Sequence, residues 1–126
     1  MRFMQLCIKS IFNHKVLVKV MDIVILREYC ISKKAATESF PFGEDTLVFK
    51  VNDKIFALVN LDGDLSINLK CDPAFAIELR ERYPDVTAGY HMNKKHWNTV
   101  MLNGSVPDKE VFSWIDHSYE LITGKH

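Results

Sequence analysis

Residues 90–97 hold the densest group of chemically versatile side chains in the chain, in the order Tyr-His-Met-Asn-Lys-Lys-His-Trp. Lysines and protonated histidines bind phosphate oxygens, an asparagine amide adds a donor, and an indole ring stacks on an exposed base. This segment therefore predicts a nucleic-acid contact made mainly to phosphates. The candidate binding residues are His91, Asn93, Lys94, Lys95, His96 and Trp97.

The same segment has a purely structural interpretation. Two lysines at a turn serve solubility, and a large aromatic residue that begins a strand in a small domain is most often part of the core. We therefore expect Trp97 to pack inside the domain. Lys94 is then the stronger candidate for binding.

Metal binding is an alternative, because His91, His96 and His117 are potential ligands and Cys71 is a more distant one. The separation of His91 from His96 crosses a turn and can bring two imidazoles together. No carboxylate or thiol stands at a helpful spacing, however. We predict neither a metal site nor a cofactor.

Catalytic patterns are weak. The sequence contains no nucleophile elbow, phosphate-binding loop or GxGxxG motif. Ser118 and Tyr119 have no neighbour in sequence that would activate them, and Ser118 suits a position that needs a small residue. Glu44 and Asp45 are adjacent in a connector, where a solvated pair is commoner than an acid/base pair. We predict that the protein is not an enzyme.

Length and charge limit the classes of function. With 126 residues the chain fits one domain, and 48% hydrophobic residues with 25% charged residues indicate a folded protein. The 16 basic and 16 acidic residues cancel, but all four charges in residues 1–20 are basic, which leaves −4 for residues 21–126. Because nonspecific DNA affinity depends on lysine and arginine, the domain is expected to bind DNA weakly.

Residues 1–20 form a basic leader, and residues 21–126 form the expected domain. Met21 followed by the helix-capping Asp22 is typical of a natural beginning, so a start placed too early is the favoured explanation. The rival interpretations are a basic arm that contacts nucleic acid and an amphipathic surface helix.

Cysteine usage and hydropathy indicate a cytoplasmic protein. Cys7, Cys30 and Cys71 are odd in number and widely spaced, which indicates reduced thiols rather than disulfides. No run reaches the roughly 18 apolar residues that a membrane span needs, so we expect no membrane partner.

Periodicity and punctuation predict the order α-β-β-β-α-β-β-α. This order is typical of an α+β fold in two layers, with an antiparallel sheet and helices on one side. The expected helices run from Asp22 to about Ser32, from Asp72-Pro73 to Tyr83, and from Pro107-Asp108 to about Thr123-Gly124. The expected strands are Thr46–Val51, Lys54–Leu61, Asp64–Lys70, Val86–Met92 and Trp97–Leu102.

Short dipeptides predict the hairpin turns of this sheet. Asn52-Asp53 tolerates positive φ, and Asp62-Gly63 is an even stronger signal for a two-residue type I′ turn. In the connector before the first strand, we expect Phe40 and Phe42 to enter the core.

The sheet face without helices offers a second function class, a protein-interaction or chaperone-like module. We expect Val48, Phe56 and Leu58 on this outer face. If exposed, they would form an apolar patch for a protein partner or for self-association. Clustering of Lys54, Arg82, Lys94 and Lys95 would favour nucleic acid instead, whereas scattered charges would favour a protein partner.

Four segments of the sequence resemble the MmcQ/YjbR family. They are FPFGEDTLVFKV (Phe40–Val51), KCDPAFAIELRERYPDV (Lys70–Val86), GYHMNKKHWNTV (Gly89–Val100) and DHSYELI (Asp116–Ile122). The resemblance implies a secretion-chaperone-like α+β fold and DNA binding through a double wing of hairpins. The segment from His91 to Trp97 would belong to one of these wings.

Overall fold

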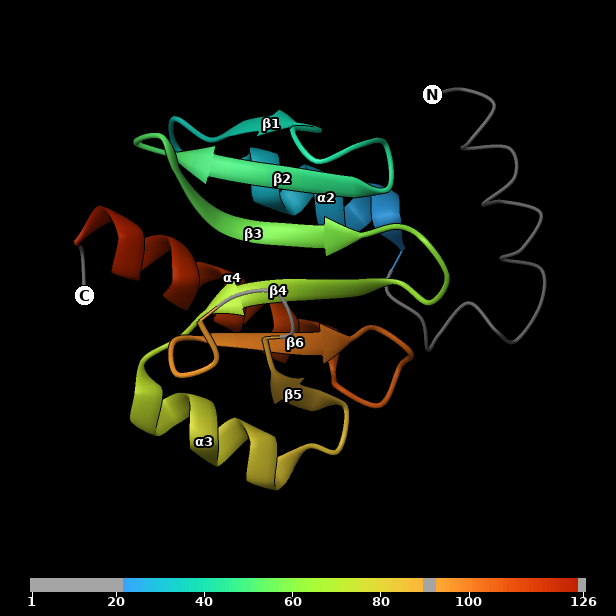
Figure 1. The fold of residues 1–126 in the computed structure, drawn as a ribbon, viewed down its shortest axis with the longest axis vertical. Helices are drawn as coiled ribbons and strands as arrows, with labels where there is room; N and C mark the ends of the chain where they lie inside the picture. The colour runs from blue at the N-terminus through green and yellow to red at the C-terminus, as the bar shows by residue number, and fades with distance from the viewer. Residues whose placement is uncertain (1–21, 90–92, 125–126) are drawn as a thin grey trace.

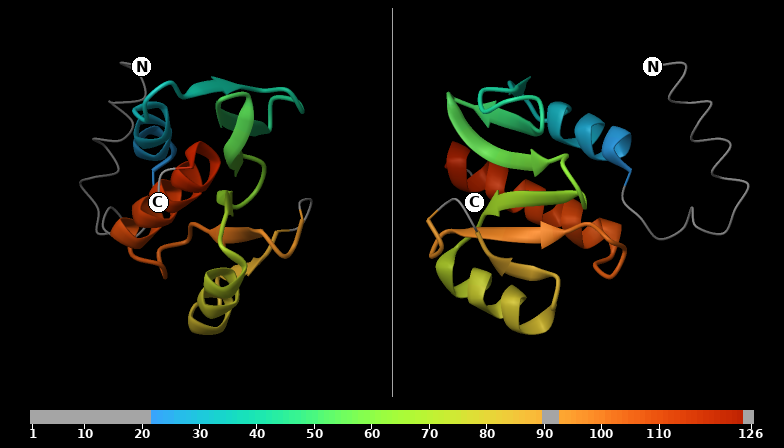
Figure 2. Two further views of the ribbon diagram at one scale, coloured as in Figure 1. Left: turned by 90° about the vertical axis from the view of Figure 1, so that its left-hand side faces the viewer. Right: turned by 45° about the vertical axis from the view of Figure 1, so that its right-hand side comes forward.

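The computed structural model describes residues 22–89 and 93–124, in which six antiparallel strands form one sheet. The spatial order of the strands is β1-β2-β3-β4-β6-β5 (Figure 1). The helices α2 and α4 lie behind this sheet in Figure 1 and together on one side of it in the left view of Figure 2. The predicted two-layer α+β fold is therefore confirmed.

The helices are α2 (Ile23–Ile31), α3 (Pro73–Arg82) and α4 (Asp108–Thr123). The strands are β1 (Thr37–Ser39), β2 (Thr46–Val51), β3 (Lys54–Asn60), β4 (Ser66–Lys70), β5 (Val86–Ala88) and β6 (Trp97–Met101). The basic leader, His91 and the end of the strand predicted for Val86–Met92 lie outside the described residues. Within those residues, no helix has the length and apolar character needed to cross a membrane.

The helix boundaries follow the capping signals of the sequence. The carboxylate of Asp22 accepts a hydrogen bond from Val24 N at 2.7 Å, and that of Asp72 accepts one from Phe75 N at 3.3 Å. Pro73 occupies the first position of α3, where its missing N–H costs nothing. These local signals placed the helices correctly because each cap depends on only a few neighbouring residues.

The connector before β2 contains a strand that the sequence pattern did not predict. β1 pairs antiparallel with β2, but its three residues, Thr-Glu-Ser, are too few and too polar to show alternation. The same pairing holds the chain at the sheet edge, so the loop after β1 stands outside the helix layer. Phe40 and Phe42 are consequently 50% and 65% exposed, and the prediction that they enter the core is wrong.

The two predicted hairpin turns differ. Asn52 and Asp53 have φ values of 54° and 63°, as a type I′ turn requires. In the second connection only Gly63 has positive φ, at 74°, and residues 61–65 form a longer loop between β3 and β4. The type I′ prediction for Asp62-Gly63 is therefore wrong, although a positive-φ glycine does stand there.

A β-bulge interrupts the pairing of β2 with β3. Phe49 pairs with Ala57 whereas Lys50 pairs with Ile55, so Phe56 is the extra residue. A bulge breaks the strict alternation of a strand. Phe56 therefore points into the core, where it is fully buried with its ring 6.4 Å from that of Phe49, and the prediction that it lies on the outer face is wrong.

The hydroxyl of Ser118 on α4 closes the gap that accompanies this bulge. Ser118 Oγ donates to the carbonyl oxygen of Phe56 at 2.6 Å and accepts from Lys70 N at 3.0 Å. Its side chain is fully buried. One hydroxyl thus satisfies a backbone acceptor on β3 and a backbone donor at the end of β4.

Replacing Ser118 with alanine should lower the free energy of unfolding by about 2–3 kcal/mol, because two buried backbone groups lose their partner. Chemical denaturation measures this loss. Ser39→Ala, at an exposed position whose hydroxyl bonds to no other described residue, serves as the control. A loss below about 0.5 kcal/mol in Ser118→Ala, the range of ordinary surface changes, would contradict a bridging role for the hydroxyl.

Candidate functional site

The outer face of the sheet presents one continuous row of paired residues across all six strands. Its members, in spatial order, are Ser39, Val48, Leu58, Asn68, Thr99 and Thr87. Parallel rows on either side add Thr37, Lys50, Ile55, Lys70 and Trp97 at one end and Thr46, Asn60, Ser66 and Met101 at the other. None of these strand positions holds a carboxylate, so the outer face carries only positive formal charge.

The condition for an apolar patch on this face, exposure of Val48, Phe56 and Leu58, is not met. Val48 is on the outer face but is fully buried, and Leu58 is half-buried. Phe56 belongs to the core cluster. The remaining side chains of the central row are hydroxyls and the Asn68 amide, and Asn68 accepts a hydrogen bond from Thr99. The outer face is therefore mainly polar and does not offer a large apolar surface to a protein partner.

Five lysines gather at one end of the sheet, and we call this group the basic end: Lys50, Lys54, Lys70, Lys94 and Lys95. Strand register fixes their grouping, because the end of β2, the start of β3, the end of β4 and the start of β6 all adjoin. None of the five forms an ion pair with another described residue. Such lysines are available to external anions.

Carboxylates are concentrated elsewhere. Glu44, Asp45, Asp62 and Asp64 lie in the loops at the opposite end of the strands. The basic end itself includes Asp53 and Asp72, but the carboxylate of Asp72 is engaged as the cap of α3. Arg82 does not join the basic end, since it pairs with Glu78 on α3. The charge of the domain is thus polarised along the strands.

The turn of residues 93–96 is held by hydrogen bonds to its backbone, one of them made by the Asn93 side chain. Asn93 Oδ1 accepts from Lys95 N at 2.9 Å, and Asn93 O accepts from His96 N at 3.1 Å. His96 O in turn accepts from Cys71 N at 2.7 Å, which ties the turn to the end of β4. Lys94 and Lys95 are exposed on this turn, as predicted, while Asn93 serves the turn itself.

Arg80 on α3 also positions the turn, and the sequence interpretation missed it. Its Nη2 donates to the carbonyl oxygen of Lys94 and, at 3.4 Å, to that of Trp97. Its Nε donates to Asn98 Oδ1 at 2.7 Å. Its helix position could have indicated this role. Arg80 follows the buried Ala76 by four residues, so it lies on the face of α3 that packs against the domain.

Trp97 lies on the outer face and outside the core cluster, so the prediction that it packs inside is wrong. Its partner in the register is Lys70. The core tryptophan is instead Trp114, which is 4% exposed and meets Tyr83 edge-on with ring centroids 5.3 Å apart. Trp97 is half-buried, which leaves part of the indole open beside a lysine.

Gly89 makes room for this arrangement. Its N–H donates to Trp97 O at 2.8 Å, and a Cβ at position 89 would stand 2.8 Å from Trp97 Cβ. Real Cβ atoms essentially never approach that closely. Position 89 therefore requires glycine, because any side chain there would overlap Trp97.

Within residues 22–89 and 93–124, no three His, Cys, Asp or Glu side chains gather as a metal ion would need. His91, one of the possible ligands, is outside those ranges. His117 Nε2 accepts from Asp72 N at 3.2 Å, so this nitrogen already has a partner. Burial raises the pKa of Cys30 and of Cys71 to about 12, which keeps both thiols protonated.

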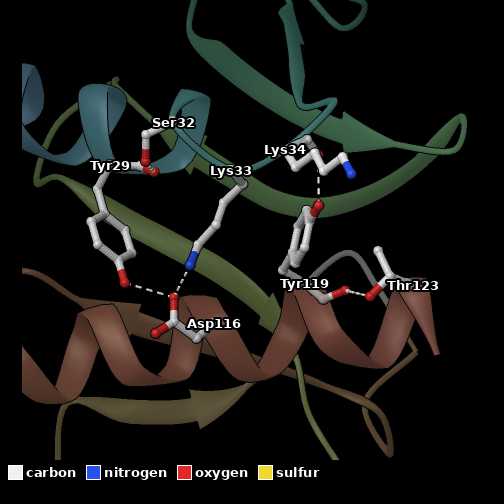
Figure 3. A network of polar contacts seen from close by, with 7 residues as sticks. All are labelled: Tyr29, Ser32, Lys33, Lys34, Asp116, Tyr119 and Thr123. Carbon is white, nitrogen blue, oxygen red and sulfur yellow. Dashed lines mark hydrogen bonds and ion pairs between the residues drawn. The ribbon is translucent and has the colours of Figure 1, made fainter. Parts of the chain in front are cut away.

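A second polar group joins α2 to α4 on the helix side of the sheet (Figure 3). Asp116 accepts from Tyr29 Oη at 2.6 Å and from Lys33 Nζ. Tyr119 Oη donates to Lys34 O at 2.6 Å. Burial alone would lower the pKa of Lys33, but the hydrogen bond and the negative charge of Asp116 outweigh it and raise that pKa.

The pKa of Tyr29 is likewise raised, first by burial and then by its hydrogen bond to Asp116. Both groups therefore keep their protons at neutral pH: Lys33 stays a cation and Tyr29 a neutral donor. We interpret this group as structural, because its hydrogen bonds join the α2 region to α4.

The chain belongs to the YjbR family, whose model matches residues 31–121. It is 37% identical to the uncharacterized protein YjbR of Escherichia coli strain K12 over 101 residues, which cover 79% of this chain and 86% of that protein. It is also 39% identical to the uncharacterized protein YbdF of Escherichia coli O157:H7 over 84 residues, covering 66% and 69%.

Two solved structures share the fold. The Deinococcus radiodurans protein DR2400, domain DUF419, matches with a TM-score of 0.79 and 39% identity over 84% of this chain and 81% of that one. The Pseudomonas syringae protein PsR293 matches with a TM-score of 0.71 and 33% identity over 80% and 98%. The resemblance identified in the sequence is thereby confirmed.

Gly89→Ala should lower the free energy of unfolding by about 1–3 kcal/mol, because the added methyl group overlaps Trp97 Cβ and the sheet edge must shift. Thermal unfolding followed by circular dichroism measures the effect. Gly63→Ala supplies the comparison, since a Cβ there meets nothing within 4 Å and only its positive φ opposes the change. Equal stability of Gly89→Ala and the unaltered protein would show that the close approach is absent.

Proposed function

We propose that this domain binds nucleic acid weakly through the basic end of its outer face. The observation that carries the proposal is the group of five lysines without ion-pair partners among the described residues, set beside a sheet face whose strand positions hold no carboxylate. Lysines bind phosphates as point charges and carry no sequence information themselves. The proposed contact is therefore with DNA phosphates, independent of sequence.

Two hairpin tips at the basic end fit the double-wing arrangement that the family resemblance implies. One is the β2–β3 turn, where Lys54 follows Asn52 and Asp53, and the other is the turn of residues 93–96. The second tip is the stronger wing, because it carries Lys94 and Lys95 without a carboxylate. With −4 on residues 21–126, we expect affinities in the micromolar range or poorer at physiological salt.

The proposed role is binding without catalysis, in the cytoplasm. It is supported by the engagement of the Ser118 hydroxyl with backbone groups on both sides. The raised pKa values of Cys30 and Cys71 remove two further nucleophiles. Unpaired reduced thiols are typical of cytoplasmic proteins, and DNA is present in the same compartment in bacteria.

Lys94→Glu combined with Lys95→Glu should weaken binding to two duplexes of unrelated sequence by the same factor, because phosphate contacts are lost. Fluorescence anisotropy with labelled duplexes measures the affinity over a series of salt concentrations. The slope of log affinity against log salt should flatten by about 0.9 for each lost contact.

The matched control is the full chain with Lys34→Glu and Lys109→Glu, two exposed lysines outside the basic end. It has the same net charge and the same leader as the test variant, so the leader's own contribution cancels. Equal weakening in both double variants would mean that net charge rather than the basic end governs binding. Unchanged affinity in the test variant would refute the proposed site.

A second candidate function, binding of a protein partner or of a second copy, is favoured by one observation. Phe40 and Phe42 are 50% and 65% exposed on the loop at the acidic end of the sheet, and exposed aromatic residues are enriched in interfaces. Self-association through this loop predicts sedimentation that depends on protein concentration and becomes monomeric in Phe40→Ser with Phe42→Ser. A wild-type chain that stays monomeric at all concentrations would exclude self-association. A different protein would then be the only remaining partner for this loop.

A further inference from the structure

We infer that the nucleic acid bound by the outer face is single-stranded, and that it crosses the strands from Lys50 on β2 to Trp97 on β6. This inference rests on the proposed function and names the substrate class of the same surface. Four observations carry it: the width of the face, the placement of Trp97, the polar central row and the asymmetry of charge.

The width of the face excludes entry into a duplex groove. Six strands leave five spacings of about 4.8 Å, so the sheet is about 24 Å wide. The major groove is only about 12 Å wide and admits a helix or a two-stranded ribbon. The sheet is therefore too wide to enter the groove and can touch only the phosphate ridges of a duplex. A single-stranded nucleic acid can lie flat across the face.

Trp97 stands where a single strand would need a stacking partner. It is half-buried on the outer face, and its register partner Lys70 lies one strand away on β4. An unpaired base can stack on the indole while the adjoining phosphate reaches the lysine. A paired base in a duplex has no free face for such a contact, which is why stacking on aromatic side chains is typical of single-strand recognition.

The rest of the path lacks negative charge and is mainly polar, with Ile55 on β3 as its apolar member. From Trp97 the nucleic acid would pass Lys70 on β4 and then reach Lys50 on β2, two β-strands further on. Asn68 and Thr99 border this path. Side-chain amides and hydroxyls can pair with base edges that a duplex keeps hidden. About three strand spacings separate Lys50 from Trp97, roughly 14 Å, which gives space for a few nucleotides.

The charge asymmetry confines the path to one end of the face. Phe42 is an exposed aromatic residue elsewhere on the molecule, but Glu44 and Asp45 follow it after Gly43. These carboxylates repel a phosphate backbone. Phe42 therefore supplies an internal control: like Trp97 it has ring surface open to solvent, but its charge surroundings differ.

The test uses the full chain and a labelled oligothymidylate of about 15 nucleotides, a length within the site sizes of single-strand binders. The same labelled strand annealed to its complement is the duplex probe. Fluorescence anisotropy should show the single strand binding about tenfold or more tightly than the duplex. Trp97→Ala should lose about tenfold or more of the single-strand affinity, Trp97→Phe should keep most of it, and Phe42→Ala should change nothing.

Intrinsic fluorescence supplies a readout that does not depend on Trp97→Ala remaining folded. Stacking should quench the emission of the wild-type chain, and Trp97→Phe, which retains only the buried Trp114, should lose most of that quenching. Equal affinity for the two probes, or preference for the duplex, with no effect of Trp97→Ala would overturn the single-strand inference and leave the proposed function standing. Absence of salt-sensitive binding to either probe at low salt would overturn both.

Discussion

One buried hydroxyl, that of Ser118, connects the helix layer to the sheet where the bulge in β3 leaves backbone groups without ladder partners. Its bonds to Phe56 O and Lys70 N make α4 part of the sheet's hydrogen-bond system. Buried polar groups are costly when unpaired, so the bulge is tolerable only with such a partner. Other contacts of α4 add to this anchor: Asp116 binds Tyr29 of α2 and Lys33 just beyond that helix, and Trp114 packs on Tyr83 beyond the end of α3.

The bulge also decides what the outer face becomes. By turning Phe56 inward it removes a large aromatic side chain from the outer surface and adds it to the core. Beyond the bulge, the outer positions are mainly hydroxyls, amides and lysines. The described carboxylates lie in loops and on helices, apart from Glu38 on β1, which pairs with Arg27 of α2. A domain whose residues 21–126 sum to −4 can therefore still present a face with positive charge only. Net charge describes long-range behaviour, whereas binding depends on where the charges lie.

Local signals in the sequence predicted most of the fold. The helix caps at Asp22 and Asp72, the Asn52-Asp53 turn and the alternation of β4 each depend on a few neighbouring residues. The errors arose where pairing between distant segments decides: β1 exists because β2 lies beside it, and Phe56 turns inward because of the register with Phe49. Trp97 was expected in the core because large aromatic residues in strands of small domains are usually buried, and the sequence pattern alone does not distinguish the outer face from the inner one.

The candidate site was predicted only in part, because local signals reveal some of its residues and contacts between distant segments bring in the others. The exposed lysines of the 93–96 turn were recognised from their types and spacing. Their union with Lys50 and Lys70 requires strand register, and the role of Arg80 requires a contact between a helix and a turn fourteen residues apart. Neither is encoded in any short segment.

A map of amide NMR shifts during titration with an oligonucleotide tests directly whether the basic end of the outer face is the binding surface. Binding there predicts shifts concentrated at residues 93–97, at the end of β4 and at the end of β2, with α2 and the exposed side of α4 unaffected. Shifts centred on the loop of Phe40 and Phe42 or on the helix layer would place the binding surface elsewhere, and an absence of shifts would show that the domain does not bind the oligonucleotide.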